Sequence, residues 1–164
     1  MLAEDVVERC RDLLARDLTR IQEATVALTD EQVWWRPNER SNSIANLILH
    51  LCGNLSQWGL AGLGGESFER RRRQEFDIRE TTTRAELLAR LEAVVSGVEA
   101  IVERLDESEL LRRRMIQGYD ATGIRALLGI VEHLSHHTGQ IIYIAKMLGP
   151  PDHVIDFYPQ HKDE

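Results

Sequence analysis

The sequence predicts an all-α protein, a four-helix bundle formed by a single domain of residues 1–164. Apolar residues recur at helical spacing along four long stretches of the chain. Serine or threonine caps precede three of these stretches, and glycine or proline stops follow two of them. With 164 residues, 43% of them apolar, the chain is long enough to bury a core without disulfides or metals to brace it.

The first long helix is predicted over about residues 3–27, where apolar side chains form one stripe. Thr29 then looks like the N-cap of a short helical turn, which Pro37 ends. Trp34 and Trp35 lie on that turn, and we expect both indoles to plug the end of the core.

The second long helix is predicted from about 41–43 to 61, before a Gly-Leu-Gly-Gly stop at 62–65. It is apolar nearly all round, which is typical of a central helix. One stripe along it is nevertheless polar, with spacings of four, four and three: Asn46, His50, Asn54 and Gln57. Because polar groups on a buried helix need partners, this stripe indicates a functional or hydrogen-bonded face.

A charged linker follows over residues 64–80 and is longer than most helix–helix connections. Its basic run, Arg70 to Arg73, lies among acidic residues. One interpretation is a solvated charged loop. The other is a pocket rim on which Arg72 and Arg73 bind a phosphate or carboxylate of a substrate, since guanidinium forks suit such anions.

The third long helix is predicted to begin after a cap at Thr82 or Thr83, and Glu86, three residues after Thr83, completes a capping-box pattern. Residues 106–120 then form an irregular connection with a short β-like piece. Thr122 caps the fourth long helix, which continues to about Leu148 and ends before a Gly-Pro-Pro stop.

Two histidines interrupt the apolar stripe of the fourth helix. The stripe has the alternating spacing of four and three that points into a bundle: Ala126, Ile130, His133, His137, Gln140 and Ile144. His133 and His137 are four residues apart, so they share one helical face, whereas His136 lies on the adjoining face.

A pair of imidazoles facing His50 on the second helix is the arrangement of a tris-histidine metal site. Three protein ligands leave coordination positions open, and the metal then acidifies a bound water or thiol or polarises a carbonyl. Imidazole ligands suit zinc, nickel, copper or iron. A bundle whose core histidines are satisfied by hydrogen bonds alone is the alternative. Leu134 follows His133, so the glutamate of an HExxH protease is missing.

Composition and charge narrow the class of protein. The net charge of −7 and pI near 5.4 disfavour a nucleic-acid partner. No apolar run reaches the roughly 18 residues that span a bilayer, so we expect no membrane partner. The amphipathic, acidic N-terminus is unlike a secretory signal and predicts a cytoplasmic protein. Cys10 and Cys52 are too few for a disulfide framework.

The run Ser41-Asn-Ser-Ile-Ala-Asn-Leu-Ile-Leu-His50, together with His133-Leu-Ser-His-His-Thr-Gly-Gln140, resembles the DinB-like superfamily. The Trp34–Pro37 turn and the 72–77 loop resemble one uncharacterised bacterial branch of it. The resemblance implies a four-helix bundle of the DinB/maleylpyruvate-isomerase-like type and a homodimer. It also implies one divalent metal, zinc or nickel first, held by His50, His133 and His137.

Relatives named by the resemblance are thiol S-transferases and a mycothiol-dependent maleylpyruvate isomerase, in which the metal activates a low-molecular-weight thiol. We therefore expect a metal-dependent transferase or hydrolase-like enzyme acting on a small-molecule substrate with a thiol or water. Asn54 and Gln140 are expected in its pocket, and Arg72 and Arg73 on an anionic substrate arm. The alternative is a noncatalytic dimeric metal-binding or stress-related protein, whose structural metal has a fourth ligand such as His153 or a carboxylate.

Overall fold

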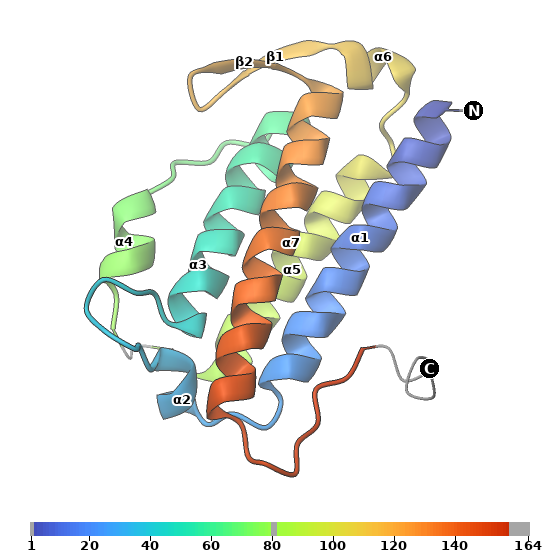
Figure 1. Ribbon diagram of the computed structural model, residues 1–164. Helices are drawn as coiled ribbons and strands as arrows, with labels where there is room; N and C mark the ends of the chain where they lie inside the picture. Colours follow the sequence, from blue (N-terminus) through green and yellow to red (C-terminus); the bar gives the residue numbers. More distant parts are fainter. Residues whose placement is uncertain (1, 80–81, 158–164) are drawn as a thin grey trace.

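Four long helices run side by side along the molecule (Figure 1). The computed structural model describes residues 2–79 and 82–157. Its elements are α1 (Leu2–Thr25), α2 (Asp30–Trp34), α3 (Ile44–Leu55), the π-helical η1 (Ser56–Leu63), α4 (Arg72–Asp77), α5 (Arg84–Val102), α6 (Glu107–Leu111), β1 (Arg113–Ile116), β2 (Tyr119–Thr122) and α7 (Gly123–Leu148). The predicted all-α four-helix bundle is confirmed, with α1, α3, α5 and α7 as its long helices.

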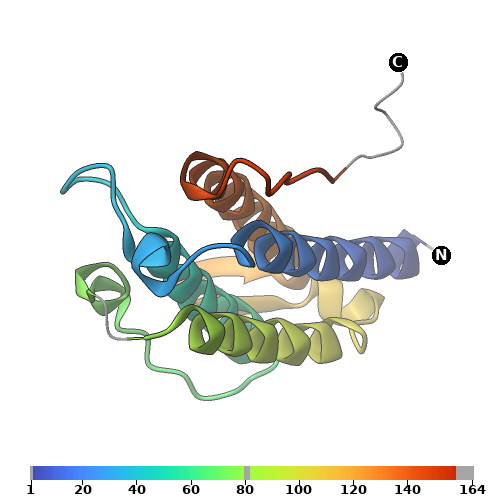
Figure 2. The same cartoon turned by 90° about the horizontal axis from the view of Figure 1, so that it is seen from below.

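Each long helix contacts two others. Helix α7 packs between α1 and α3, and α5 packs behind them against the same two helices (Figure 1). Seen from below, α2 lies across one end of the bundle (Figure 2). Within the described ranges, none of the helices combines the length and the apolar character that crossing a membrane requires.

The core is one continuous cluster to which all four long helices contribute. Its largest fully buried side chains include Leu14, Ile21, Ile48, Leu51, Leu55, Leu87, Leu91, Leu127, Leu134 and Ile141. Helix α3 is buried without interruption from Ile44 to Gly53, which confirms that it is the central helix. A polar side chain on α3 must therefore find its partners inside the protein.

Side-chain caps begin the helices where the sequence predicts them. The hydroxyl of Thr83 accepts a hydrogen bond from the Glu86 backbone amide, and the Glu86 carboxylate accepts one from the Thr83 amide. The hydroxyls of Thr122 and Ser43 cap α7 and α3 in the same way. Each cap satisfies amides that a helix start leaves without intrahelical partners, which explains why these boundaries are local properties of the sequence.

The second predicted helix consists of two different helical segments. Regular α3 ends at Leu55, and the chain continues to Leu63 as the π-helix η1. Gly59 lies on η1 against α5, where a Cβ atom would stand 2.5 Å from a methyl group of Val98. The missing side chain therefore allows η1 and α5 to approach closely.

The linker and the irregular connection contain short elements. Helix α4 lies in the middle of the 64–80 linker, where the sequence predicts no helix. Its six residues are too few to show helical periodicity. In the 106–120 connection, α6 precedes a hairpin in which Arg113 pairs with Thr122 and Ile116 with Tyr119. The predicted β-like piece is confirmed.

Only one of the two tryptophans on α2 plugs the core. Trp34 is buried, and its indole N–H donates to the backbone oxygen of Thr82 over 2.8 Å. Trp35 is 40% exposed, so the prediction for this residue is wrong. Trp35 is the C-cap of α2 and has an extended backbone, which turns its side chain away from the bundle.

Candidate metal centre

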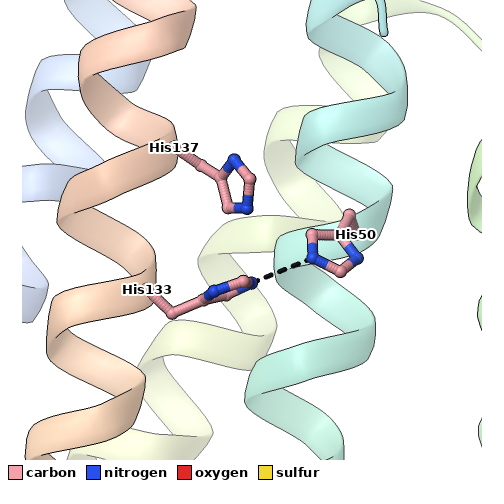
Figure 3. Close-up of side chains that lie close together, drawn as sticks. All are labelled: His50, His133 and His137. Atoms are coloured by element: carbon pink, nitrogen blue, oxygen red, sulfur yellow. Dashed lines mark hydrogen bonds between the residues drawn. The ribbon is translucent and has the colours of Figure 1, made fainter.

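The three predicted histidines lie together between α3 and α7 (Figure 3). His50 points from α3 toward His133 and His137, which project from successive turns of α7. One ring nitrogen from each histidine lies within 4.8 Å of the other two, and Nε2 of His133 is 2.9 Å from Nε2 of His50. The bundle thus brings together residues that are 83 positions apart in the chain.

The three rings differ in their burial. His50 is buried, whereas His133 and His137 are half-buried at the edge of the core. The buried face of α7 includes Ala126 and Ile130 of the predicted stripe, but from His133 onward it is shifted by one residue to Leu134, Thr138, Ile141 and Ala145. One residue corresponds to about 100° around a helix, so the histidine stripe lies beside the core and Gln140 is exposed. The prediction that this stripe faces the core is therefore confirmed for Ala126 and Ile130, which are fully buried, and is wrong for Gln140.

The outer nitrogen of His50 contacts a carboxylate that the sequence analysis missed. Nδ1 of His50 is 2.8 Å from Oε2 of Glu75 on α4. Arg70 donates to both oxygens of that carboxylate, from Nε over 2.7 Å and from Nη2 over 2.9 Å. A glutamate close to a run of arginines is the one sequence signal for this pair, because no periodicity relates α4 to α3.

The outer nitrogen of His137 has a partner on its own helix. Nδ1 of His137 is 2.7 Å from Oε1 of Gln140, and an amide oxygen only accepts hydrogen bonds. The proton of His137 therefore lies on Nδ1 and leaves the lone pair of Nε2 free. Gln140 in turn approaches Nε2 of the exposed His136 over 3.3 Å. Gln140 was predicted beside the site, and it orients one of the three imidazoles.

The surroundings favour the neutral form of His133 and His137. Burial, followed by the neighbouring His137 and His50, lowers the pKa of His133 to about 4. Burial also lowers the pKa of His137, although its hydrogen bond with Gln140 acts in the opposite direction. Neutral imidazole is the form that binds a metal, so near neutral pH these two rings are in the binding form.

The donor set fits a divalent metal. Around a zinc ion with Zn–N bonds of about 2.1 Å, tetrahedral ligand nitrogens stand about 3.4 Å apart. The nitrogens of the cluster, 2.9 Å apart in the closest pair and within 4.8 Å overall, bracket that separation. Within residues 2–79 and 82–157, no fourth histidine, cysteine or carboxylate joins this group. The three histidines can therefore hold a metal and leave coordination positions open.

Two hollows of about 600 Å³ each lie along α7 on either side of the cluster. His133 lines one of them, together with Asn54, Trp58, Arg125 and Glu132. Asn54 lies there as predicted, and its buried Oδ1 accepts no hydrogen bond from the described part of the chain. The other hollow is lined by His136, Gln140, Tyr143, Arg40 and Met147, among others.

The other candidate site residues are not part of the three-histidine group. Arg73 is on the outer side of α4, where its side chain is 93% exposed and pairs with Asp77 over 3.2 Å. The guanidinium of Arg72 lies 5.3 Å from the ring centre of Phe76. Neither arginine lines the two 600 Å³ hollows. His153 lines a different hollow beside the end of α1 and is not part of the metal-binding group.

Comparisons with known proteins agree with this architecture. The model of a family described as a protein of unknown function, DUF1572, matches residues 2–155. No curated protein matches the chain. A conserved protein from Enterococcus faecalis has a similar structure, with a TM-score of 0.71 and 15% identity over 86% of this chain and 95% of that one.

Two further solved structures are of DinB-like proteins. One, from Bacillus subtilis, has a TM-score of 0.65 and 21% identity, covering 87% of this chain and 94% of its own. The other, from Bacillus cereus, has a TM-score of 0.63 and 16% identity, covering 80% and 85%. These likenesses show a shared fold, and they confirm the DinB-like assignment at that level.

Proposed function

The chain belongs to the DUF1572 family, and from that premise we propose that it is an enzyme that uses a divalent metal bound by His50, His133 and His137. One observation carries the proposal: three imidazole nitrogens lie within 4.8 Å of one another at the edge of a hollow large enough for a small molecule. In that hollow, His133 connects the cluster to the space that a substrate would occupy.

The number of ligands supports a catalytic metal over a structural one. Structural zinc sites are closed by four protein ligands, whereas catalytic sites keep a position for water or substrate. The cluster contains three ligands among the described residues. His153, considered as a fourth ligand, lies in another hollow.

A bound metal would lower the pKa of a coordinated water or thiol, so that the nucleophile is available at neutral pH. The protein's own cysteines are poor nucleophiles, because both are buried and burial raises the pKa of Cys52 to about 12. The attacking group would therefore come from solution, as water or a low-molecular-weight thiol. Asn54 lines the hollow, and its Oδ1, which has no hydrogen-bond partner among the described residues, would accept an N–H or O–H from the substrate.

Metal content tests the first step. Protein purified without a histidine tag is expected to bind about one equivalent of zinc or nickel. The substitutions His50→Ala, His133→Ala and His137→Ala should each weaken binding more than about tenfold, because each removes one of three ligands. His136→Ala is the matched control, since this exposed ring is not in the group. Less than about a tenth of an equivalent after zinc or nickel is added back would refute the proposal.

The reaction is tested by turnover. The zinc- and nickel-loaded protein is assayed against a panel of electrophiles with bacillithiol, mycothiol, glutathione or no thiol. Turnover that needs a thiol and is lost in His50→Ala identifies a transferase, and turnover without a thiol identifies a hydrolase. Rates equal to those of His50→Ala throughout would favour a noncatalytic metal-binding protein.

A further inference from the structure

We propose that Glu75, held by Arg70, is a positioning residue that orients the neutral His50 ring with its proton on Nδ1 and its Nε2 free for a metal, so that α4 is part of the metal centre. This inference rests on the proposed function, because it assigns a role to residues that support one of the proposed ligands.

The contact between Glu75 and His50 decides which ring nitrogen faces the cluster. Oε2 of Glu75 lies 2.8 Å from Nδ1 of His50, and a carboxylate only accepts, so the proton is on Nδ1. Nη2 of Arg70 lies 3.1 Å from the same nitrogen and would favour the other tautomer by donating to it. The negative charge of Glu75 at the shorter distance favours the proton on Nδ1. The lone pair of Nε2 then points toward His133.

Arg70 holds both carboxylate oxygens of Glu75 in a fork. The side chains are only 5% exposed for Arg70 and 11% for Glu75, which distinguishes this pair from a surface ion pair. The fork therefore fixes the orientation of the carboxylate that faces His50.

The surface of α3 leaves space for the Glu75 carboxylate at Gly53. Gly53 is three residues after His50, and a Cβ atom at Gly53 would lie 2.1 Å from Oε1 of Glu75. A side chain of any size at this position would push the carboxylate away. The absence of a side chain next to His50 is thus required for the contact between Glu75 and the ring.

The backbone of α4 is anchored to α3 separately from its charged side chains. The side-chain amide of Asn46 donates to the backbone oxygens of Glu75 over 2.9 Å and of Ile78 over 3.3 Å. Arg36 donates to the backbone oxygen of Phe76 over 3.0 Å. These hydrogen bonds fix the position of the Glu75 backbone, so the side chain extends to His50 from a defined position. They also explain why the buried Asn46 belongs to the polar stripe of α3.

A carboxylate on the outer nitrogen of a ligand histidine orients the ring and raises the basicity of the ligand nitrogen. Removing such a partner typically weakens metal binding about tenfold to a hundredfold. Gln140 does the same for His137 with a neutral amide, so His50 is the one of this pair whose partner carries a charge.

The test compares Glu75→Gln with Asp77→Asn, which removes an exposed carboxylate from the same helix. Zinc affinity is measured by competition with a chromogenic chelator, and the cobalt-substituted proteins are compared by absorption. Glu75→Gln is expected to weaken zinc binding about tenfold or more and to shift the cobalt spectrum, with Asp77→Asn like the wild type. Gly53→Ala keeps the carboxylate of Glu75 but should weaken zinc binding as Glu75→Gln does. The new methyl group would displace the end of the flexible Glu75 side chain from His50.

A second measurement is made on metal-free protein, where nitrogen NMR of the His50 ring reports its tautomer. The Nδ1–H form should dominate in the wild type and decline in Glu75→Gln. If the wild type binds zinc and both Glu75→Gln and Gly53→Ala bind it equally well with unchanged tautomer and spectrum, the inference is overturned while the proposed function stands. If the wild type binds no zinc or nickel, the proposed function itself fails.

Discussion

At the scale of single residues, the three histidines of the cluster differ in their environments. His50 is buried and faces a charged carboxylate, His137 faces an amide, and the Nε2 atom of His133 faces His50. The pKa of His133 falls to about 4, with burial as the largest cause. The neutral form of this ring is therefore favoured, because protonation would add a positive charge that burial and two neighbouring imidazoles disfavour.

This environment predicts a pH dependence for the metal-free protein. Between its unfolded pKa of 6.5 and its folded pKa of about 4, His133 binds a proton in the unfolded chain but not in the folded one. Its contribution to stability is therefore complete above about pH 6.5 and is lost as the pH falls toward 4. Urea unfolding of the wild type and His133→Gln over this range checks the prediction: the wild type should lose more stability on acidification. Parallel losses would contradict it.

At the scale of elements, α1 and α7 are joined by a buried polar contact. Asp17 on α1 is 1% exposed, and it accepts hydrogen bonds from the Ser135 hydroxyl on α7 and from Nε of Arg16, the latter over 2.8 Å. Ser135 lies between His133 and His137 in sequence but on the opposite side of α7. The contact therefore helps to set the rotation of α7, and with it the direction in which the histidines point.

Substituting Asp17 tests this contact. Asp17→Ala leaves the Ser135 hydroxyl without its acceptor and is expected to lower the free energy of unfolding by about 1–3 kcal/mol. Asp12→Ala removes an exposed carboxylate from the same helix and should change it by less than about 0.5 kcal/mol. Chemical denaturation of both variants measures the difference. If both substitutions changed the free energy of unfolding equally, the buried hydrogen bond between Ser135 and Asp17 would make no measurable contribution to stability.

At the scale of the whole molecule, the proposed metal would connect two helices that are distant in sequence. Its ligands lie on α3 and α7, and these helices also form part of one core with α1 and α5. A ligand that binds only the folded state stabilises it by mass action. The homodimer that the resemblance implies remains a prediction at this scale.

Removing the metal should lower the thermal midpoint. With free zinc at about a hundred times the dissociation constant, the bound state gains about 2.7 kcal/mol. For a chain of 164 residues this corresponds to roughly 5–10 °C. Calorimetry with and without a chelator measures the shift, and His50→Ala, which binds the metal at least about tenfold more weakly, should show no more than about half of it. A chelator effect of equal size in that variant would show that the ion binds elsewhere.

Local patterns in the sequence were sufficient for the four long helices and for the three histidines of the cluster. Thr83 and Thr122 cap helices by hydrogen bonds within four residues, and the spacing of His133 and His137 puts both on one face. His50 was also predicted, because a polar stripe on an apolar helix demands partners. These features depend on chain geometry over one or two turns, which the sequence encodes directly.

Only the tertiary structure decided the rotation of α7 and the partner of His50. Two stripes of equal spacing lie one residue apart on α7. Both stripes are buried near the start of α7, at Ala126 and Leu127, and packing against α1 and α3 decides that from His133 onward the buried stripe is the one that starts at Leu134. Glu75 reaches His50 across 25 residues that have no repeating pattern, through contacts of α4 with Asn46 and the space at Gly53. Such contacts depend on where distant segments meet, which no local pattern specifies, whereas caps and helical spacing depend only on neighbours in the chain.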